Sequence, residues 1–420
     1  MLNSSTLMVY AAIGIIAGAI VNWAIYRLAW NKREIGPWSP LPVSVDRRPV
    51  LARIPILGWL FLRGESTVHG SGFWIRPLLI ECGMGLFFAF FANWKAEQFT
   101  EIAMVGLIEN SVVVWQTVAH LTLISLLVAA TFVDFDEQTI PDEITLAGIV
   151  AGLTFAVAGP GVELWTPQFG EALGTATRLG FIDEVDWPES FGSLRGMLIA
   201  MAIVGCWGLA SMPKICTLKY GFKRGVQYLI ASVIRPRRKT LPKGAPRRRK
   251  PFPISTAIAV ASIVFWVVIA VVWNNGSFEV QFRLMTSLVG ISGAMALVWS
   301  VRIVSRYAMG QEAMGFGDVT LIGVIGAFLG WQAAIVTFFL APLAGVIIGI
   351  IQRIVTGKAE MAFGPYLSFG AVVVMMHWQW IWEHHAYKMF SLGWVLPGMI
   401  ACGVLLMGGI LYVMQLMKRR

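Results

Sequence analysis

Charged residues are scarce in this chain of 420 residues, since Asp, Glu, Lys and Arg together make up only 13% of it. Ordinary soluble domains carry about 25%, so this deficit excludes a soluble enzyme and a disordered tail protein. Apolar residues are abundant instead, at 57% of the chain, with a mean hydropathy of +0.70. The net charge of +10 does not predict a nucleic-acid partner, because the basic residues lie in loops between apolar segments.

Cysteine is scarce as well. The chain has 4 cysteines, none of them in a CxxC pair, so neither a disulfide framework nor a zinc knuckle is expected. All of them lie inside or just after an apolar segment, and we interpret them as packing residues. They are Cys82, Cys206, Cys216 and Cys402.

Long apolar segments are the dominant feature of the sequence. Several are about 20 residues long, which is the length that a helix needs to cross a bilayer. The pattern predicts an all-α polytopic membrane protein with about eleven transmembrane helices. A break at Gly330-Trp331-Gln332 divides one long apolar stretch into two. The segments lie near residues 7–29, 77–93, 111–133, 144–159, 193–211, 254–273, 283–304, 319–331, 332–352, 364–382 and 391–416.

The charges of the loops predict how the chain is oriented in the membrane. The segments 30–76 and 212–252 and the C-terminal Lys418-Arg419-Arg420 are basic, whereas the segment 160–192 is acidic. With about eleven spans and an external N-terminus, the positive-inside rule places every basic region in the cytoplasm and the acidic loop outside. Anionic membrane lipids would then hold the segment 212–252 near the inner leaflet.

Two acidic motifs lie at the ends of apolar segments, where a buried charge is costly. One runs from Asp134 to Asp142, and the other is Gly315-Phe316-Gly317-Asp318. The predicted orientation puts both on the cytoplasmic side, so Asp134 and Asp318 can meet at one depth. Two close carboxyl groups share a proton, and such a pair can activate a water and polarise a scissile carbonyl. The structural alternatives are a helix N-cap for Asp318 and a solvated helix end for Asp134.

Six short motifs in chain order carry a family resemblance. They cover Gly18 to Leu28, Arg53 to Gly64, Arg76 to Glu81, Asp134 to Asp142, Gly315 to Leu321 and Phe363 to Gly370. Together they resemble the type IV prepilin peptidases, membrane aspartic proteases of the GxGD class that also methylate their products. The resemblance implies a core of roughly eight spans, to which this chain adds a helical pair and a C-terminal helix.

The resemblance implies that Asp134 and Asp318 are the catalytic pair. Glycines on both sides of Phe316 would let the backbone approach an extended peptide closely, and Asp142 is expected to cap the helix that begins near Glu143. The supporting motif residues are Gly315, Gly317, Pro141 and Asp142. The acidic residues beside the site would form either a rim that attracts a basic leader or a solvated loop. These residues are Asp136, Glu137 and Glu143.

The resemblance also implies a second activity, which is N-methylation of the new terminus with S-adenosylmethionine as donor. The protease itself is expected to need no cofactor. The matched polar residues for a donor pocket are Asn22, Arg27, Arg76 and Glu81, although no Gly-rich nucleotide-binding turn accompanies them. Glu81 would alternatively pair with a basic residue such as Arg27 and brace the first cytoplasmic subdomain.

This sequence departs from the family pattern in several places. Family members commonly hold paired CxxC motifs in the first cytoplasmic loop, but the segment 30–76 has no cysteine, so zinc is not expected. The fold of this loop would depend on apolar residues such as Ile54, Ile56, Leu57 and Trp59. Thr320 replaces the Lys of G-x-G-D-x-K-L. Either 193–211 or 283–304 corresponds to the family's fifth span, and we favour 283–304 because it leads directly into the GxGD motif.

These observations predict how the chain is divided. The regions are a first transmembrane span (1–29), a cytoplasmic subdomain (30–76), a membrane core with Asp134 (77–159), an insertion with an acidic external loop, a helical pair and a basic cytoplasmic loop (160–282), a second part of the core with GxGD (283–382), and an extra span with a basic tail (383–420).

The predicted function is cleavage of the basic leader of pilin-like or pseudopilin-like precursors, as used in type IV pili and type II secretion. The active site would face the cytoplasm from a bacterial inner membrane. One alternative is a proton-coupled transporter with Asp134 and Asp318 as relay acids, which would need acids nearer the midplane. A catalytically silent assembly platform is the other, and the presence of both acids argues against it.

Overall fold

The computed structural model describes residues 2–41, 48–103, 110–159, 164–167, 174–176, 192–210, 254–310, 314–356, 362–393 and 395–418. The basic segment 212–252 and most of the acidic segment 160–192 lie outside these described residues. Their predicted sidedness therefore stays a prediction.

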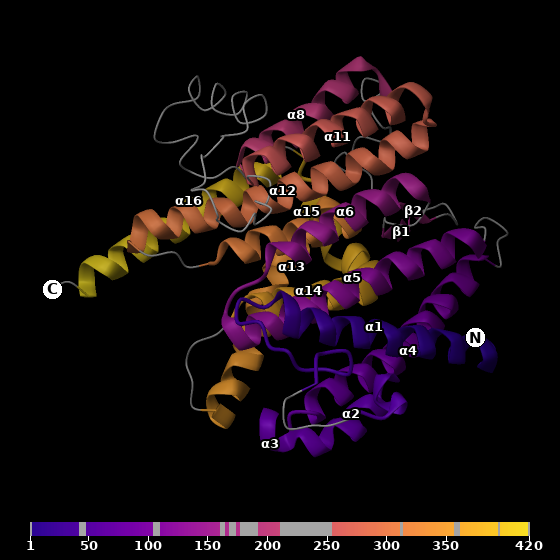
Figure 1. The fold of residues 1–420 in the computed structure, drawn as a ribbon. Coiled ribbons are helices and arrows are strands. Elements are labelled where there is room, and N and C mark those ends of the chain that lie inside the picture. Colours follow the sequence, from indigo (N-terminus) through magenta and orange to yellow (C-terminus); the bar gives the residue numbers. More distant parts are fainter. Residues whose placement is uncertain are drawn as a thin grey trace, which may run out of the picture.

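Helices make up nearly all of the described chain (Figure 1). The long ones are α1 (Ser4–Leu28), α4 (Ile75–Ala103), α5 (Asn110–Glu137), α6 (Asp142–Ala158), α8 (Leu194–Ala210), α11 (Ile254–Asn275), α12 (Phe278–Met309), α13 (Phe316–Thr356), α14 (Gly364–Ile381) and α16 (Val395–Lys418). Short helical pieces are η1 (Val50–Arg53), α2 (Leu57–Phe61), η2 (Leu62–Glu65), α3 (Ser66–His69), η3 (Trp382–Ala386) and α15 (Tyr387–Phe390). Two short antiparallel strands, β1 (Trp165–Pro167) and β2 (Gly174–Ala176), pair with Thr166 opposite Thr175.

The prediction of an all-α polytopic membrane protein is confirmed, since each predicted apolar segment is helical. Among the described residues, 7 helices are long and apolar enough to cross a membrane by length and composition. The expected total of about eleven spans counts α13 as two and includes three further helices. Of these, α6 and α8 have 17 residues each and α14 has 18. They are shorter than the others.

Gly330 divides α13 into two helices, as the break in the sequence predicted. Its φ of 80° and ψ of 174° are far from helical values, and glycine adopts them without steric cost. The second half of α13 packs on α14, with Gly345 against Tyr366 and Gly370 against Thr337. The residue numbers rise along one helix as they fall along the other, so the two are antiparallel. The second half of α13 therefore runs back toward the end at which α14 begins.

The first half of α13 packs most closely against α12. Gly290 and Gly326 face each other there, and a Cβ added at Gly290 would clash with the Gly326 carbonyl oxygen. Small residues that allow two backbones to approach are typical of helix interfaces in membranes. Around this interface, buried apolar side chains of the long helices form one continuous core.

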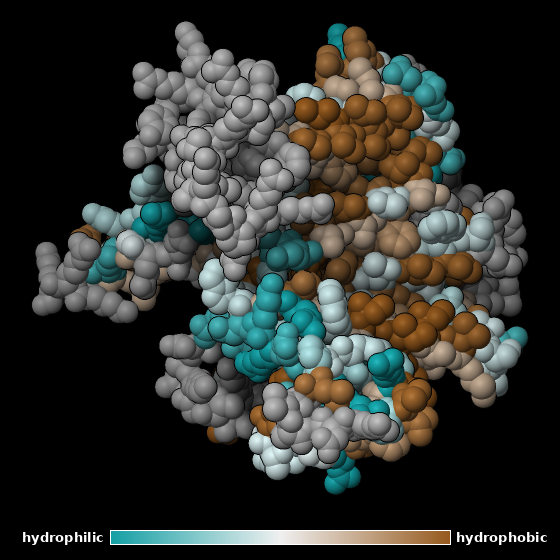
Figure 2. Space-filling view, viewed as in Figure 1, coloured by the Kyte–Doolittle hydropathy of each residue, from teal (hydrophilic) through white to brown (hydrophobic). Residues whose placement is uncertain are grey.

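The helices α8, α11 and α16 add fewer buried side chains to this core. The helices α8 and α11 pack on each other, and the Trp266 indole donates to the Met201 carbonyl at 2.8 Å. The C-terminal α16 rests on α12 with only 6% of its apolar window buried. Figure 2 shows broad apolar surfaces over α8, α11 and α12, and hydrophilic side chains gathered at the end of the bundle where α1 ends.

Candidate active site

The two predicted catalytic residues lie at the same end of the helix bundle. Asp134 is in the last turn of α5, and Asp318 is the third residue of α13. Ile140, between α5 and α6, packs against both Gly317 and Gly364, the first residue of α14. The end of α5 and the starts of α13 and α14 therefore converge around the Ile140 side chain.

The Asp134 carboxyl group is held by the start of α14. Asp134 is only 5% exposed, and its Oδ2 accepts a hydrogen bond of 3.0 Å from the Gly364 backbone N–H. A Cβ at Gly364 would lie 2.6 Å from this same oxygen. Gly364 is thus a site residue that the sequence showed only as part of the motif 363–370, without indicating its partner.

The Asp318 carboxyl group is held by its own GxGD loop. Asp318 is 7% exposed, and its Oδ2 accepts a 3.0 Å hydrogen bond from the Gly315 N–H, one residue before the helix. This is the arrangement of the acid in a capping box, not that of an N-cap residue. Gly317 packs on Ile140, where a Cβ would come within 2.9 Å of the Ile140 Cβ. Both motif glycines therefore help to hold the Asp318 carboxyl group in place.

The two carboxyl groups interact electrostatically. The charge of Asp134 acts on Asp318, and the guanidinium of Arg302 acts on it with the opposite sign. Arg302 belongs to α12 and lies over the Phe316 ring, 5.6 Å from its centroid. It supplies a positive charge near the site, where Thr320 replaces the lysine of the family motif. Sequence reasoning missed Arg302 because it lies on a different helix and outside every motif.

The prediction that Asp142 caps α6 is wrong. Pro141 is the N-cap residue, and no side chain bonds to the free N–H groups from that position. Pro141 has a fixed φ and no N–H of its own, so the helix begins directly after it. Asp142 is exposed in the first turn, where its charge complements the helix dipole.

Two of the acids beside the site hold helix ends together. Asp136 pairs with Arg76 through two hydrogen bonds of 2.8 Å, which joins the end of α5 to the start of α4. Glu137 accepts hydrogen bonds from the backbone N–H groups of Trp30 (2.6 Å) and Asn31 (2.9 Å), just after α1. Neither acid is therefore part of an open rim or of a merely solvated loop.

Glu81 is the buried anchor of the subdomain between α1 and α4. It is 1% exposed, and its carboxylate accepts hydrogen bonds from Asn22 Nδ2 (3.1 Å), Trp59 Nε1 (2.7 Å) and the Ile56 N–H (2.5 Å). The predicted pairing with Arg27 is wrong, because Arg27 lies 3.5 Å from Glu34 instead. Glu81 does brace the subdomain, but it does so through neutral donors.

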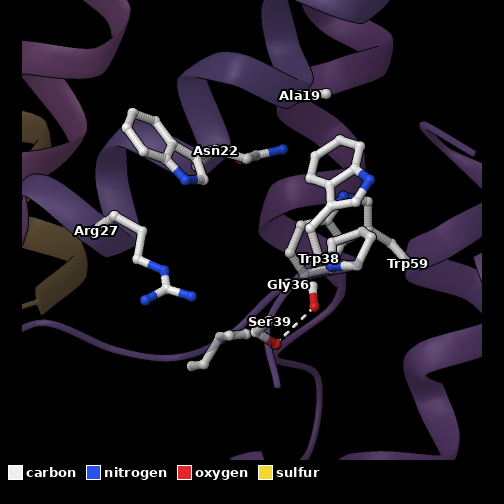
Figure 3. Close-up of a pocket in the computed structure, with 10 residues that line it drawn as sticks. Ala19, Asn22, Arg27, Gly36, Trp38, Ser39 and Trp59 are labelled. Carbon is white, nitrogen blue, oxygen red and sulfur yellow. Dashed lines mark hydrogen bonds between the residues drawn. The ribbon is translucent and has the colours of Figure 1, made fainter. Parts of the chain in front are cut away.

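The four residues proposed for a donor pocket are only partly brought together. Asn22 and Arg27 line a small cavity of about 50 Å³ with Trp38 and Trp59, and Figure 3 shows them around it. Glu81 contacts two of these lining residues. Arg76 is absent from the described lining of this cavity and bonds to Asp136 at the end of α5.

The cysteine-free subdomain is held by an ion pair as well as by apolar packing. Trp59 is buried at 1% exposure as expected, but Ile54 and Leu57 are each 43% exposed. Arg48 forms hydrogen bonds of 2.6 and 2.7 Å with both carboxylate oxygens of Glu65. It also donates to the carbonyl oxygens at residues 36 and 39. This arrangement fixes the loop that would otherwise depend on exposed apolar side chains.

Two family models match the chain. The type IV leader peptidase family matches residues 121–183 and 253–350, which include Asp134 and Asp318. The bacterial peptidase A24 N-terminal domain matches residues 12–95, which contain Asn22 and Glu81. The unmatched segment 184–252 is shorter than the predicted insertion 160–282. The matched residues include α12, which contains the favoured segment 283–304, but they do not include α8, which corresponds to the other candidate, 193–211.

Curated relatives named prepilin leader peptidase/N-methyltransferase are similar to parts of the chain. The relative from Pectobacterium carotovorum subsp. carotovorum is 33% identical over 115 residues, which cover 26% of this chain and 41% of the relative. The relative from Pseudomonas aeruginosa is 34% identical over 82 residues, covering 19% and 28%. The relative from Escherichia coli is 27% identical over 118 residues, covering 26% and 51%.

The matched part thus spans about half or less of the length of these relatives, from 28% to 51%. No solved structure matches the chain. The two family models do not overlap and together match more than half of the chain. The chain therefore belongs to the type IV leader peptidase family.

Proposed function

We propose that this protein is a membrane aspartic endopeptidase that cleaves the leader of pilin-like or pseudopilin-like precursors. The observation that carries the proposal is the pair of buried carboxyl groups, Asp134 and Asp318, each held by one backbone N–H at the same end of the bundle. The relatives named prepilin leader peptidase support the substrate class.

The geometry indicates which oxygen atoms of the two carboxyl groups would take part in the reaction. Each carboxyl group uses Oδ2 to accept a backbone N–H, from Gly315 or from Gly364. We assign to the Oδ1 atoms the shared proton and the attacking water. The ionised carboxyl group takes a proton from the water, and the protonated one donates its proton to the scissile carbonyl oxygen. Repulsion between two close carboxylates keeps one of them protonated.

The transporter alternative has no support in the structure. Its relay acids would lie nearer the middle of the membrane, whereas Asp134 is in the last turn of α5 and Asp318 is in the first turn of α13. We propose further that the Asp134–Asp318 dyad lies on the cytoplasmic side of a bacterial inner membrane. The basic subdomain residues lie at the same end of the bundle, as the Arg76–Asp136 pair shows, and basic loops favour the cytoplasmic side.

The test is cleavage of a precursor peptide that has a basic leader, a Gly and then a long apolar run. Asp134→Asn and Asp318→Asn should each abolish cleavage, because neither amide can share the proton. Glu279→Gln is the control, since this side chain is 84% exposed at the start of α12 and should leave cleavage unchanged. Processing at the normal rate by either Asp variant would refute the assignment.

The relatives' names also include an N-methyltransferase activity, and N-methylation by this chain stays a prediction. Asn22 Oδ1 is buried with no hydrogen-bond partner in the described part of the chain, so the cavity beside it offers an acceptor. A cavity of about 50 Å³ is nevertheless far smaller than ligand pockets of roughly 300–1,000 Å³. S-adenosylmethionine does not fit this cavity. Label transfer from the methylated donor to a cleaved peptide would show the activity.

A further inference from the structure

A second feature lies beside the dyad: an apolar groove of about 640 Å³ between α4, α5 and α14. Its floor consists of side chains that are at most 6% exposed. They are Ile80, Met84, Ile124 and Leu127. Its walls are formed by exposed side chains, such as Leu79 at 64% and Phe369 at 52%. The groove is therefore open along its length and closed underneath.

One end of the groove lies near Asp134. Leu127 and Thr131 line it, and together with Asp134 they follow the i, i+4, i+7 spacing of one helix face. Pro365 also lines it and directly follows Gly364, whose N–H holds Asp134. The distance along α5 from Ile124 to Asp134 is about 15 Å, so the groove extends away from the carboxyl groups for roughly three helical turns.

Ser368 places an unpaired polar atom inside this apolar groove. It is 5% exposed and lines the groove on α14, one turn beyond Gly364. Its Oγ has no hydrogen-bond partner among the residues that the structure describes. A buried hydroxyl without a partner is costly, and in this position it indicates a ligand that brings a polar group to one turn from the dyad.

We propose that this groove binds the apolar helical segment of the substrate that follows the scissile bond, with the first turn of that segment against Ser368. The inference rests on the proposed function. A helix that begins just after an extended scissile bond presents backbone N–H groups with no partner inside the helix. The Ser368 hydroxyl can accept from one of them. A lipid acyl chain would fill the apolar length of the groove but would leave Ser368 unpaired.

Gly83 allows the groove to be blocked without disturbing the free protein. It lines the groove on α4, and a Cβ added there meets no other atom within 4 Å. The side chain of Gly83→Phe should therefore occupy the groove itself. Gly403→Phe is the matched control, because Gly403 is exposed on α16 and a Cβ there also meets nothing within 4 Å.

The first measurement compares two peptide substrates. One has a basic leader, a Gly and an apolar run of about 20 residues, and the other carries the same leader and Gly followed by polar residues. Gly83→Phe should raise KM for the apolar substrate at least about tenfold relative to the polar one, whereas Gly403→Phe should leave this ratio unchanged. An unchanged ratio in Gly83→Phe would overturn the proposal.

The second measurement places a photo-reactive phenylalanine at position 83 in the Asp318→Asn protein, which holds the substrate without cleaving it. Cross-linking to the apolar run of the substrate is expected from position 83 and not from position 403. Cross-links to lipid alone, or equal cross-links from both positions, would contradict the proposal. Failure of the proposed function looks different, since the wild-type protein would then cleave neither peptide.

Discussion

At the scale of single residues, the site depends on glycines as much as on acids. The Asp134 carboxyl lies where a side chain at residue 364 would otherwise be, because a Cβ there would come within 2.6 Å of its Oδ2. The GxGD glycines act in the same way for Asp318, through a backbone N–H and a close contact with Ile140. The backbone therefore sets where both carboxyl groups point.

Gly364→Ala should lower the rate of cleavage by about 100-fold, because the new methyl group displaces the Asp134 carboxyl by roughly 1 Å. The measurement is kcat on the precursor peptide, with thermal unfolding recorded in parallel. Gly398→Ala is the control, since a Cβ at Gly398 meets nothing within 4 Å. A Gly364→Ala protein that unfolds at the normal temperature and cleaves at the wild-type rate would show that this contact does not matter.

The sequence identified Asp134, Asp318 and the motif glycines because they lie in short motifs at helix ends. It did not identify Arg302 or the contact of Gly364 with Asp134, since these depend on how three separated helices pack. The roles of Asp136 and Glu137 were missed for a similar reason. Their partners lie at the ends of α4 and α1, and no local pattern connects them.

At the scale of elements, the subdomain between α1 and α4 is joined to the membrane helices through Glu81. One carboxylate of α4 accepts hydrogen bonds from Asn22 of α1, from the Trp59 indole and from the Ile56 N–H. Ile56 has a φ of 65°, an uncommon value for a β-branched residue. The bond to Glu81 therefore holds a turn that is not favoured by its own sequence.

Glu81→Gln should loosen this subdomain, because the amide offers one acceptor oxygen where three donors converge and brings donors of its own. We expect a loss of about 3 kcal/mol in the local stability of the subdomain. The measurement is the rate of proteolysis after Arg53, with Glu97→Gln as a control on the same helix. Equal protection of Arg53 in the wild-type and Glu81→Gln proteins would mean that Glu81 is not the anchor.

Helices were predictable from the sequence because their apolar runs have the length of a membrane span. The break at Gly330 was predictable as well, but the direction of the chain after it depends on the packing of α13 against α14. The polar cluster of Arg48 and Glu65 was not predictable, since neither residue belongs to a periodic pattern. This explains why an apolar core was expected for a loop in which Ile54 and Leu57 are exposed.

At the scale of the whole molecule, the dyad and the subdomain should face the same side of the membrane. A Cys in place of Arg53 should be protected from impermeant thiol reagents in intact cells and should react after the membrane is opened. A Cys in place of Ser277, between α11 and α12, should react in intact cells. The native cysteines are replaced by Ala in both proteins. The reverse labelling pattern would place the dyad outside.

The helices also differ in how much they contribute to the buried core. The core around α12, α13 and α14 lies within one continuous set of buried apolar side chains, whereas α16 contributes little to it. The order of the charged loops predicted which end holds the acids. It could not predict the groove beside them, because the groove is formed by three helices whose lining residues are separated in the sequence.

The most direct test of the central claim is a double-mutant cycle on the dyad, with the cleaved precursor identified by mass spectrometry. If Asp134 and Asp318 share one proton and act as a unit, the residual rate of the double Asn variant should equal that of either single variant. Cleavage between the leader and the apolar run should proceed at the normal rate only in the wild-type protein and the Glu279→Gln control. Two independent losses that multiply in the double variant, or normal cleavage by any Asp variant, would contradict the account.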